Sequence, residues 1–345
     1  MKAPSAALSR ANVSLGTSIG VSREENQDRT LFLISQSSDP AWCFALGVLC
    51  DGIGGMAKGE EAAVLALTTF AARILRTTRL RPEPRLRHAV VDANNAVFSS
   101  YSGSSGATLS AVLVTQSGPT TGVNVGDSRI YGITRDRNLR QLSKDDTLAG
   151  YLGQERAVED HHARLVQYVG MGEGVEPHII NIDTREHSHI LLTSDGVHWV
   201  PKDTMERAVS VADDPSKLVR KLLTLTSVLG GRDNGTALSM KSSPWWARDK
   251  QNAELNLICL SPVNQLEIWS PRAFDQDKAP REERDDKSRQ FAPATDDGSD
   301  TLSAEEPARR KLKKIKKKRV GGQPSLPLDD SKPEVDIVFP KRDGR

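Results

Sequence analysis

Short apolar segments, separated by glycine-rich and polar turns, recur between about residues 12 and 261. Eight of them have the length and composition of β-strands, namely 29–35, 43–50, 107–116, 122–126, 129–133, 178–182, 189–194 and 254–260. Three longer segments, 59–78, 82–101 and 213–229, show the three- and four-residue apolar spacing of amphipathic helices. Because many strand segments follow one another without an intervening helix, the pattern predicts an α+β fold of antiparallel sheets with helices packed outside.

The pattern ends on both sides of this region. Residues 263–345 are polar and charged, and such a segment buries too little apolar surface to offset the entropy lost on ordering. The sequence therefore predicts a flexible N-terminus over residues 1–11, one folded domain over residues 12–262 and a disordered tail over residues 263–345.

The charge of the chain is unevenly distributed. The formal net charge of +2 includes nine basic and no acidic residues in the segment 309–319, and the rest carries 38 basic and 45 acidic residues, a net charge of −7. A net-acidic body with one basic segment argues against a nucleic-acid-binding domain, which presents a broad basic face. That segment remains a candidate contact for nucleic acid, anionic lipid or an acidic partner, or a solvated charge run.

The composition also indicates a cellular compartment. The N-terminus has no continuous apolar stretch of the signal-peptide type, and no segment reaches the roughly 18 to 20 apolar residues that span a bilayer. The three cysteines, Cys43, Cys50 and Cys259, are odd in number and lack metal-ligand spacing, which favours reduced, buried thiols over disulfides. These features predict a cytoplasmic protein.

Four aspartates stand at or near the ends of predicted strands. Asp51 and Asp195 each end an apolar run and precede a glycine, Asp127 follows the run 122–126, and Asp233 precedes another strand. One Asp-Gly pair alone is best explained as a turn. Four carboxylates at strand ends are instead typical of a metal site, because unpaired buried charges are costly and a shared cation relieves that cost. An all-aspartate set favours Mg²⁺ or Mn²⁺ over zinc.

Six motifs around these positions resemble those of metal-dependent protein phosphatases of the PPM (protein phosphatase 2C-like) family, bacterial branch. They occur in the family's order over about residues 12–261: GVSREENQDR, VLCDGIGGMAKGEEAA, SGATLSAVLV, NVGDSRIYGI, LLTSDGVHWV and GGRDNGTALSM. The resemblance implies an αββα sandwich of two antiparallel sheets flanked by helices. It also implies hydrolysis of phosphoserine and phosphothreonine in proteins.

The resemblance implies metal-binding roles for five residues. Asp51 would bridge two Mn²⁺ or Mg²⁺ ions, and the carbonyl of Gly52 would contribute to one of them. Asp195 and Asp233 would hold the other ion. Asp127 matches the acidic position that helps to hold a third, weaker metal ion in bacterial members.

Two further residues receive roles in catalysis from the resemblance. Arg23 would grip the substrate phosphate through its planar fork of donors, and Asp28 would orient metal-bound waters. Two metal ions close together lower the pKa of a bridging water and neutralise charge on the phosphoryl oxygens. No covalent phosphoenzyme is expected, since no cysteine lies in a phosphate-cradling loop.

The sequence departs from the usual family pattern at several positions. Ile53 stands where some eukaryotic members have a histidine, and Gln27 where some have a metal-binding glutamate. Asp146 stands where the family often has a histidine, a replacement expected to alter the rim of the site or the assistance to the leaving group. The pair His161–His162 is either part of a mobile flap over the site or a plain solvated pair. Trp245–Trp246 either closes the edge of the core or forms a contact site.

Two alternatives share this sequence pattern, because fold membership alone does not prove activity. The first is a catalytically weak, phosphatase-like scaffold or phosphoprotein-binding module, which would usually have lost at least one of Asp51, Asp195 and Asp233. The second is a hydrolase of small phosphoesters. For the phosphatase, the expected partners are phosphorylated proteins, among them a Ser/Thr kinase or its targets. The basic tail is expected to dock an acidic partner, and the enzyme is expected to be a monomer.

Overall fold

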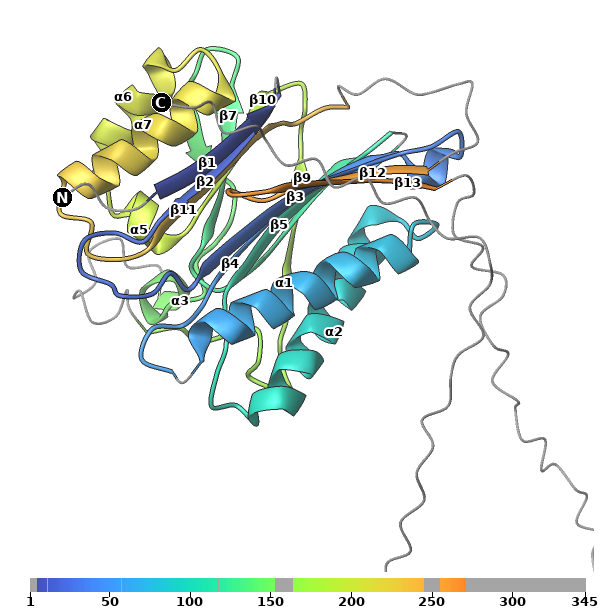
Figure 1. The fold of residues 1–345 in the computed structure, drawn as a ribbon, viewed down its shortest axis with the longest axis horizontal. Helices are drawn as coiled ribbons and strands as arrows, with labels where there is room; N and C mark the ends of the chain where they lie inside the picture. The colour runs from blue at the N-terminus through green and yellow to red at the C-terminus, as the bar shows by residue number, and fades with distance from the viewer. Residues whose placement is uncertain are drawn as a thin grey trace, which may run out of the picture. The chain divides into compact units, whose positions relative to one another are not determined.

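The computed structural model describes residues 5–10, 12–56, 58–116, 118–152, 164–244 and 255–270. Within them, two antiparallel sheets pack face to face and helices cover the outer face of each sheet (Figure 1). The predicted αββα sandwich of two antiparallel sheets is therefore confirmed.

One sheet has seven strands in the order β13-β12-β3-β4-β5-β6-β9. These are β13 (Gln265–Ser270), β12 (Leu255–Leu260), β3 (Asp28–Gln36), β4 (Phe44–Asp51), β5 (Leu109–Thr115), β6 (Thr120–Val125) and β9 (His178–Ile182). Most of β4 is buried, which explains its continuous apolar sequence. Its register with β3 pairs Asp51 directly with Asp28, so the last residue of one strand faces the first of its neighbour.

The other sheet has six strands in the order β1-β2-β11-β10-β7-β8. These are β1 (Ser5–Arg10), β2 (Val13–Ser18), β11 (Gly235–Lys241), β10 (His187–Thr193), β7 (Arg129–Thr134) and β8 (Leu139–Gln141). Apolar side chains from the two sheets, among them Leu15, Phe32 and Leu238, form the central core.

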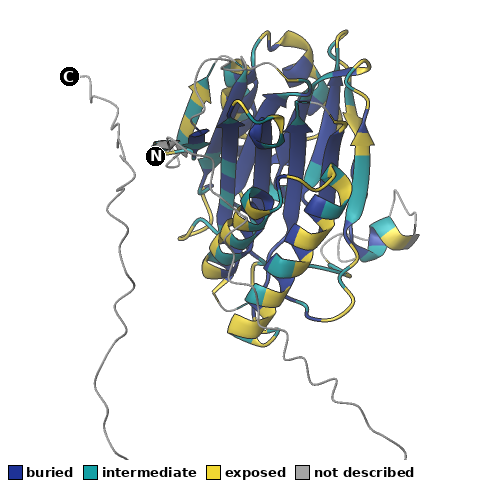
Figure 2. Cartoon of the chain, turned by 90° about the vertical axis from the view of Figure 1, so that its right-hand side faces the viewer, coloured by how far each residue is buried: buried dark blue, intermediate teal, exposed yellow. Residues whose placement is uncertain are grey.

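Helices close the sandwich on both sides. Helices α1 (Gly59–Arg76) and α2 (Pro82–Tyr101) pack on the seven-stranded sheet, and α6 (Lys202–Val211) and α7 (Pro215–Val228) on the six-stranded one. The short helices α3 (Leu148–Leu152) and α5 (Asp195–His198) lie in connections near the ends of strands. Figure 2 shows the strands as a buried block and the exposed residues on the outer faces of the helices.

One charged side chain lies fully inside this structure. Arg85 of α2 is only 1% exposed, and its Nε and Nη2 donate to the carbonyl oxygen of Ile74, in the last turn of α1, at 3.0 and 2.7 Å. The guanidinium also stacks on the Phe44 ring, 4.2 Å from its centroid. Burial lowers the pKa of Arg85 to about 9, which leaves it charged at neutral pH. Arg85 thus binds the negative end of α1 and joins the two helices.

The strands and helices predicted from the sequence are present within a few residues of their expected bounds, but the predicted domain limits at 12 and 262 leave out two edge strands. Strand β1 pairs with β2, and β13 pairs with β12. Both are short and mix polar with apolar residues, since only part of an edge strand faces the core. The pairs His161–His162 and Trp245–Trp246, and residues 271–345 with the basic segment 309–319, lie outside the described residues.

Candidate functional site

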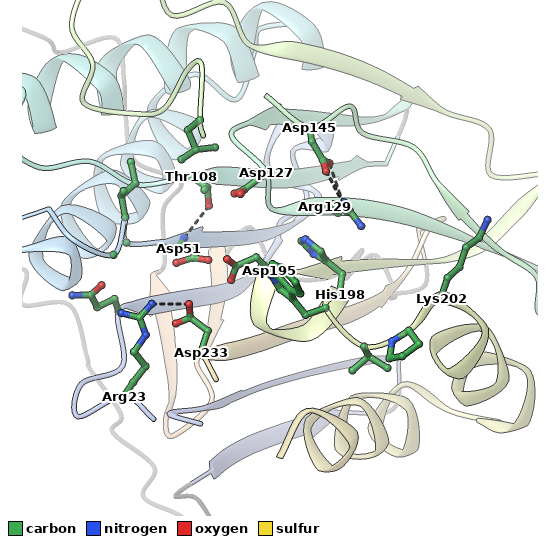
Figure 3. A pocket seen from close by; sticks show the side chains of 18 residues that line it. Arg23, Asp51, Thr108, Asp127, Arg129, Asp145, Asp195, His198, Lys202 and Asp233 are labelled. Atoms are coloured by element: carbon green, nitrogen blue, oxygen red, sulfur yellow. Dashed lines mark hydrogen bonds and ion pairs between the residues drawn. The ribbon is translucent and has the colours of Figure 1, made fainter. Parts of the chain in front are cut away.

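Strand ends from both sheets bring the predicted aspartates together. Asp51 is the last residue of β4, and Asp127 lies two residues after the end of β6. Asp195 begins α5 directly after β10, and Asp233 lies just before β11. All four line one cavity of about 660 Å³ (Figure 3). The sandwich therefore concentrates negative charge at one end of its sheets.

The cavity is also lined by Arg23 and Gly52, so six of the seven residues predicted for the site meet there. The other residues that line it are Gln27, Ile53, Gly54, Thr108, Arg129, Asp145, Leu165, His198, Trp199, Val200, Pro201 and Lys202.

The seventh predicted residue, Asp28, lies behind the cavity and is only 2% exposed. Its Oδ2 accepts a hydrogen bond from Ser194 Oγ at 2.8 Å, and its Oδ1 is buried without a partner in the structure. Burial raises the pKa of Asp28 above its ordinary value. Asp28 is paired with Asp51 across the β3–β4 ladder, so it can act on the cavity through Asp51 or through a bound water, and not by direct contact with a substrate.

Position 52 requires a glycine because the backbone at the start of α1 lies very close to it. A Cβ atom at this position would lie 2.4 Å from the carbonyl oxygen of Gly59, at the start of α1. No real Cβ contact is that short, and the obstacle is backbone, which cannot rotate away. Any larger residue at position 52 would therefore displace the start of α1 or the end of β4, and with it Asp51.

Arg23 is held beside the aspartates by a loop that is fixed to the Asp233 segment. Its Nη2 donates to Asp233 Oδ2 at 2.7 Å. Asn234 anchors the loop, because its Nδ2 donates to the carbonyl oxygens of Ile19 and Glu25, and its Oδ1 accepts from the backbone N–H of Gln27. Asn234 therefore positions Arg23, a role that the sequence did not reveal.

Burial and mutual repulsion raise the pKa values of three of the cavity carboxyls, those of Asp195, Asp127 and Asp51. Burial first, and then Asp127, Asp233 and Asp28, raise the pKa of Asp195 to about 8. Burial, followed by the charge of Asp145, raises the pKa of Asp127 to about 6. The pKa of Asp51 is raised well above its ordinary value by burial and then by Asp28, Asp195 and Asp127. A divalent cation would relieve this repulsion.

The donor set fits a hard divalent cation, since four carboxylates and the backbone at Gly52 share one cavity. In the described part of the chain, no group of three or more His, Cys, Asp or Glu side chains is already arranged to hold a metal ion. Asp233 is paired with Arg23 through Oδ2. A bound cation would compete with Arg23 for this carboxylate.

Comparison with known proteins decides the family. The family model described as Protein phosphatase 2C matches residues 15–234, a range that includes all seven predicted site residues. The chain belongs to the protein phosphatase 2C family. It is 30% identical over 206 residues to the serine/threonine protein phosphatase PstP of Mycobacterium tuberculosis, an alignment that covers 55% of this chain and 39% of the relative. The chain thus matches about two fifths of the length of that relative.

Solved structures of protein phosphatase 2C relatives have the same fold. The PPM Ser-Thr phosphatase MsPP from Mycobacterium smegmatis, in complex with cacodylate, is 28% identical, with a TM-score of 0.56, over 67% of this chain and 99% of its own. The catalytic domain of PstP, in complex with two manganese ions, is 26% identical, with a TM-score of 0.53, over 70% of this chain and 100% of its own. These relatives support the bacterial PPM type that the six motifs indicate.

No helix among the described residues of this protein phosphatase 2C member is long and apolar enough to cross a membrane.

The raised carboxyl pKa values predict how the stability of this phosphatase-family domain depends on pH. An unfolded aspartate has a pKa of about 3.9. Because Asp195 keeps its proton in the folded state up to about pH 8, its contribution to stability is full below about pH 4 and is lost as the pH rises through 8. Without divalent metal, this carboxyl cluster should therefore destabilise the fold progressively towards pH 8.5. The rise in melting temperature on adding Mn²⁺ should be larger at pH 8.5 than at pH 5.5.

Thermal unfolding with chelator and with Mn²⁺ at both pH values measures this effect. Asp195→Asn, which removes the titrating group, should reduce the pH dependence in chelator. An equal Mn²⁺-induced shift at the two pH values would contradict the expectation.

Sequence reasoning missed several residues that shape the cavity. Thr108 Oγ1 accepts the backbone N–H of Asp51 at 3.0 Å and shares a hydrogen bond with Ser128 Oγ at 2.7 Å, which fixes the end of β4. Arg129 donates to Asp145 through Nε and Nη2, with a shortest distance of 2.7 Å, and forms part of the cavity wall. The only signal for Thr108 and Arg129 in the sequence was their position inside two of the six motifs.

Asp146, expected to alter the rim of the site or assist the leaving group, is not among the residues that line the cavity. It is buried and accepts hydrogen bonds from the backbone N–H of Gly126 at 2.9 Å and from Gln167 Nε2 at 2.7 Å. Its Oδ1 lies 2.7 Å from His178 Nε2. Asp146 thus supports the turn that precedes Asp127.

Proposed function

We propose that this chain is a metal-dependent protein serine/threonine phosphatase that hydrolyses phosphoserine and phosphothreonine at a dinuclear Mn²⁺ or Mg²⁺ site. The observation that carries the proposal is the convergence of Asp51, Asp195 and Asp233 with Arg23 in one cavity. Family membership and the naming of its relatives as Ser/Thr phosphatases support the same activity. The retention of all three aspartates argues against the scaffold alternative.

The proposed ligands all line the same cavity. Asp51 would contribute to both metal ions and the carbonyl of Gly52 to one of them, Asp195 and Asp233 would hold the other ion, and Asp127 would contribute to a third, weaker one. A catalytic domain of PstP in complex with two manganese ions supports the count of two. Bound divalent ions would supply an activated water nucleophile and would neutralise charge on the phosphoryl group.

The residues of the chain itself bind and orient the substrate. Arg23 would exchange its ion pair with Asp233 for the phosphoryl oxygens, which its guanidinium can bind with two parallel hydrogen bonds. Asp28 has a buried Oδ1 available to accept a hydrogen bond, and so would orient a water molecule in the cavity. The bond of Thr108 to the Asp51 backbone would keep that carboxylate in place.

The proposed substrates are phosphorylated proteins, including a Ser/Thr kinase or the targets of such a kinase, and the proposed enzyme is monomeric and cytoplasmic. The net-acidic body and the basic segment 309–319 support docking of an acidic partner by that segment. Removing residues 271–345 should then lower activity on the protein substrate and leave hydrolysis of a small phosphoester unchanged. Equal loss on both substrates would argue against the docking role.

The decisive experiment measures phosphate release from a phosphothreonine peptide and from p-nitrophenyl phosphate by the full chain. We expect turnover of both substrates with Mn²⁺ or Mg²⁺ and none with chelator. A folded protein that binds Mn²⁺ but releases no phosphate would support the scaffold alternative. Turnover of the small ester without turnover of any phosphopeptide would favour a small-phosphoester hydrolase.

A further inference from the structure

The cavity extends well beyond the aspartates. Lys202 lies at the end remote from Arg23 (Figure 3), and Trp199, Val200 and Pro201 also line the cavity. Val200 and Lys202, together with Arg129 and His198, also line a second hollow of about 470 Å³. The two hollows share these four lining residues. The cavity at the aspartates is itself much larger than a phosphoryl group requires, so part of it is available to the rest of a substrate.

Trp199 is an unusual residue for this position. Its side chain is 63% exposed, although large aromatic residues are generally buried or held in contacts. It ends the short helix that begins with Asp195, and its backbone N–H donates to the carbonyl oxygen of Asp195 at 2.9 Å. An exposed indole in the lining of the cavity offers a flat apolar surface for a peptide chain.

Lys202 differs from the two arginines of the cavity, because its side chain forms no ion pair within the part of the chain that the structure describes. Arg23 is paired with Asp233, and Arg129 with Asp145. Burial keeps the pKa of His198 well below its ordinary value, so this side chain is neutral at pH 7. Among the described residues, no carboxylate lies within ion-pair distance of the exposed Lys202 ammonium group.

Helix stability does not explain Lys202 either. It is the first residue of α6, where the helix dipole places partial positive charge, and a cation there is unfavourable. The N-cap residue Pro201 offers no side-chain cap that would compensate. The charge of Lys202 therefore does not stabilise α6, but it is available to bind an anionic group.

We propose, on the basis of the phosphatase function above, that Trp199 and Lys202 determine specificity for protein substrates with an acidic residue near the phosphorylated threonine. The peptide chain would lie on the Trp199 indole, and the carboxylate of the acidic residue would bind the Lys202 ammonium group. The aspartates of the cavity would be occupied by metal ions, so the attraction that selects an acidic flanking residue would come from Lys202.

Charge reversal at Lys202 tests this proposal. Three phosphothreonine peptides, identical except for Glu, Ala or Lys at flanking positions, are assayed with the full chain and Mn²⁺, beside p-nitrophenyl phosphate. The wild type should hydrolyse the Glu peptide with a kcat/KM roughly fivefold above that of the Ala peptide, as expected for an exposed ion pair. Lys202→Glu should reverse the order, favouring the Lys peptide, and leave the small ester unchanged.

Two further variants complete the test. Trp199→Ala should lower kcat/KM for all three peptides by about tenfold and change the rate for the small ester less than twofold. Lys221→Glu reverses a charge on α7 outside both hollows and should keep the wild-type preference. Equal hydrolysis of the three peptides by wild type and Lys202→Glu overturns this inference alone. No turnover of any substrate overturns the proposed phosphatase function and, with it, the inference.

Discussion

Asp51→Asn is expected to lower metal-dependent hydrolysis of a phosphothreonine peptide by roughly a thousandfold. Asp51 lies opposite Asp28 in the β3–β4 ladder, and the charges of Asp28, Asp195 and Asp127 all contribute to raising its pKa, so it lies close to the other carboxyls. Asparagine keeps the shape of the side chain but removes the negative charge that a divalent cation requires. The backbone bond from Asp51 N–H to Thr108 is retained, so the fold should persist.

Asp145→Asn provides the matched control, because Asp145 lines the same cavity but is paired with Arg129. We expect it to lower the rate by less than tenfold. The stabilisation of each variant by Mn²⁺, measured as a melting-temperature shift, separates loss of metal binding from loss of chemistry. Asp51→Asn should lose most of that shift and Asp145→Asn should keep it. Similar losses of activity in the two variants would show that the cavity responds to charge in general and not to a specific ligand.

The sequence predicted the aspartate cluster because the relevant signal is local. An aspartate and a glycine directly after an apolar run, as at Asp51-Gly52 and Asp195-Gly196, can be recognised without knowledge of the fold. The aspartates meet because the strand ends that carry them lie at the same end of the sandwich. The sequence indicated this meeting only through the resemblance of its motifs to those of the family.

The supporting contacts could not be predicted, because they join residues far apart in the chain. Asn234 holds the loop of Arg23 across more than two hundred positions, and Ser194 donates to Asp28 across 166. The edge strands β1 and β13 were missed for a related reason. Their composition is not typical of a strand, and they are strands because they pair with β2 and β12.

Asp146 illustrates how a departure from a family pattern can mislead. The substitution of an aspartate for the usual histidine suggested altered chemistry at the rim. In the structure, the carboxylate is buried and bonded to Gly126, Gln167 and His178, so the position supports the backbone near Asp127. Only the hydrogen-bond partners, which the sequence does not contain, distinguish a supporting residue from one in the cavity.

Arg85→Ala is expected to lower the free energy of unfolding by about 3 kcal/mol, although Arg85 is remote from the proposed active site. Truncation would leave a cavity between α1 and α2 and would deprive the Ile74 carbonyl of both of its guanidinium bonds. The stacking contact with the Phe44 ring would also be lost. Urea-induced unfolding measures the change.

Two comparisons separate packing from charge. Arg85→Met fills most of the volume but donates no hydrogen bond, and it also removes the cost of burying a charge, so we expect a smaller loss of about 1 kcal/mol. Arg87→Ala, on the same helix, breaks an exposed pair with Glu83 and a 3.3 Å hydrogen bond to the carbonyl oxygen of Pro177, and should cost less than about 1 kcal/mol. If Arg85→Met proved as destabilising as Arg85→Ala, the bonds to Ile74 would dominate over packing. If Arg85→Ala cost no more than Arg87→Ala, Arg85 would not join the two helices, and its burial would be incidental to the stability of the sandwich.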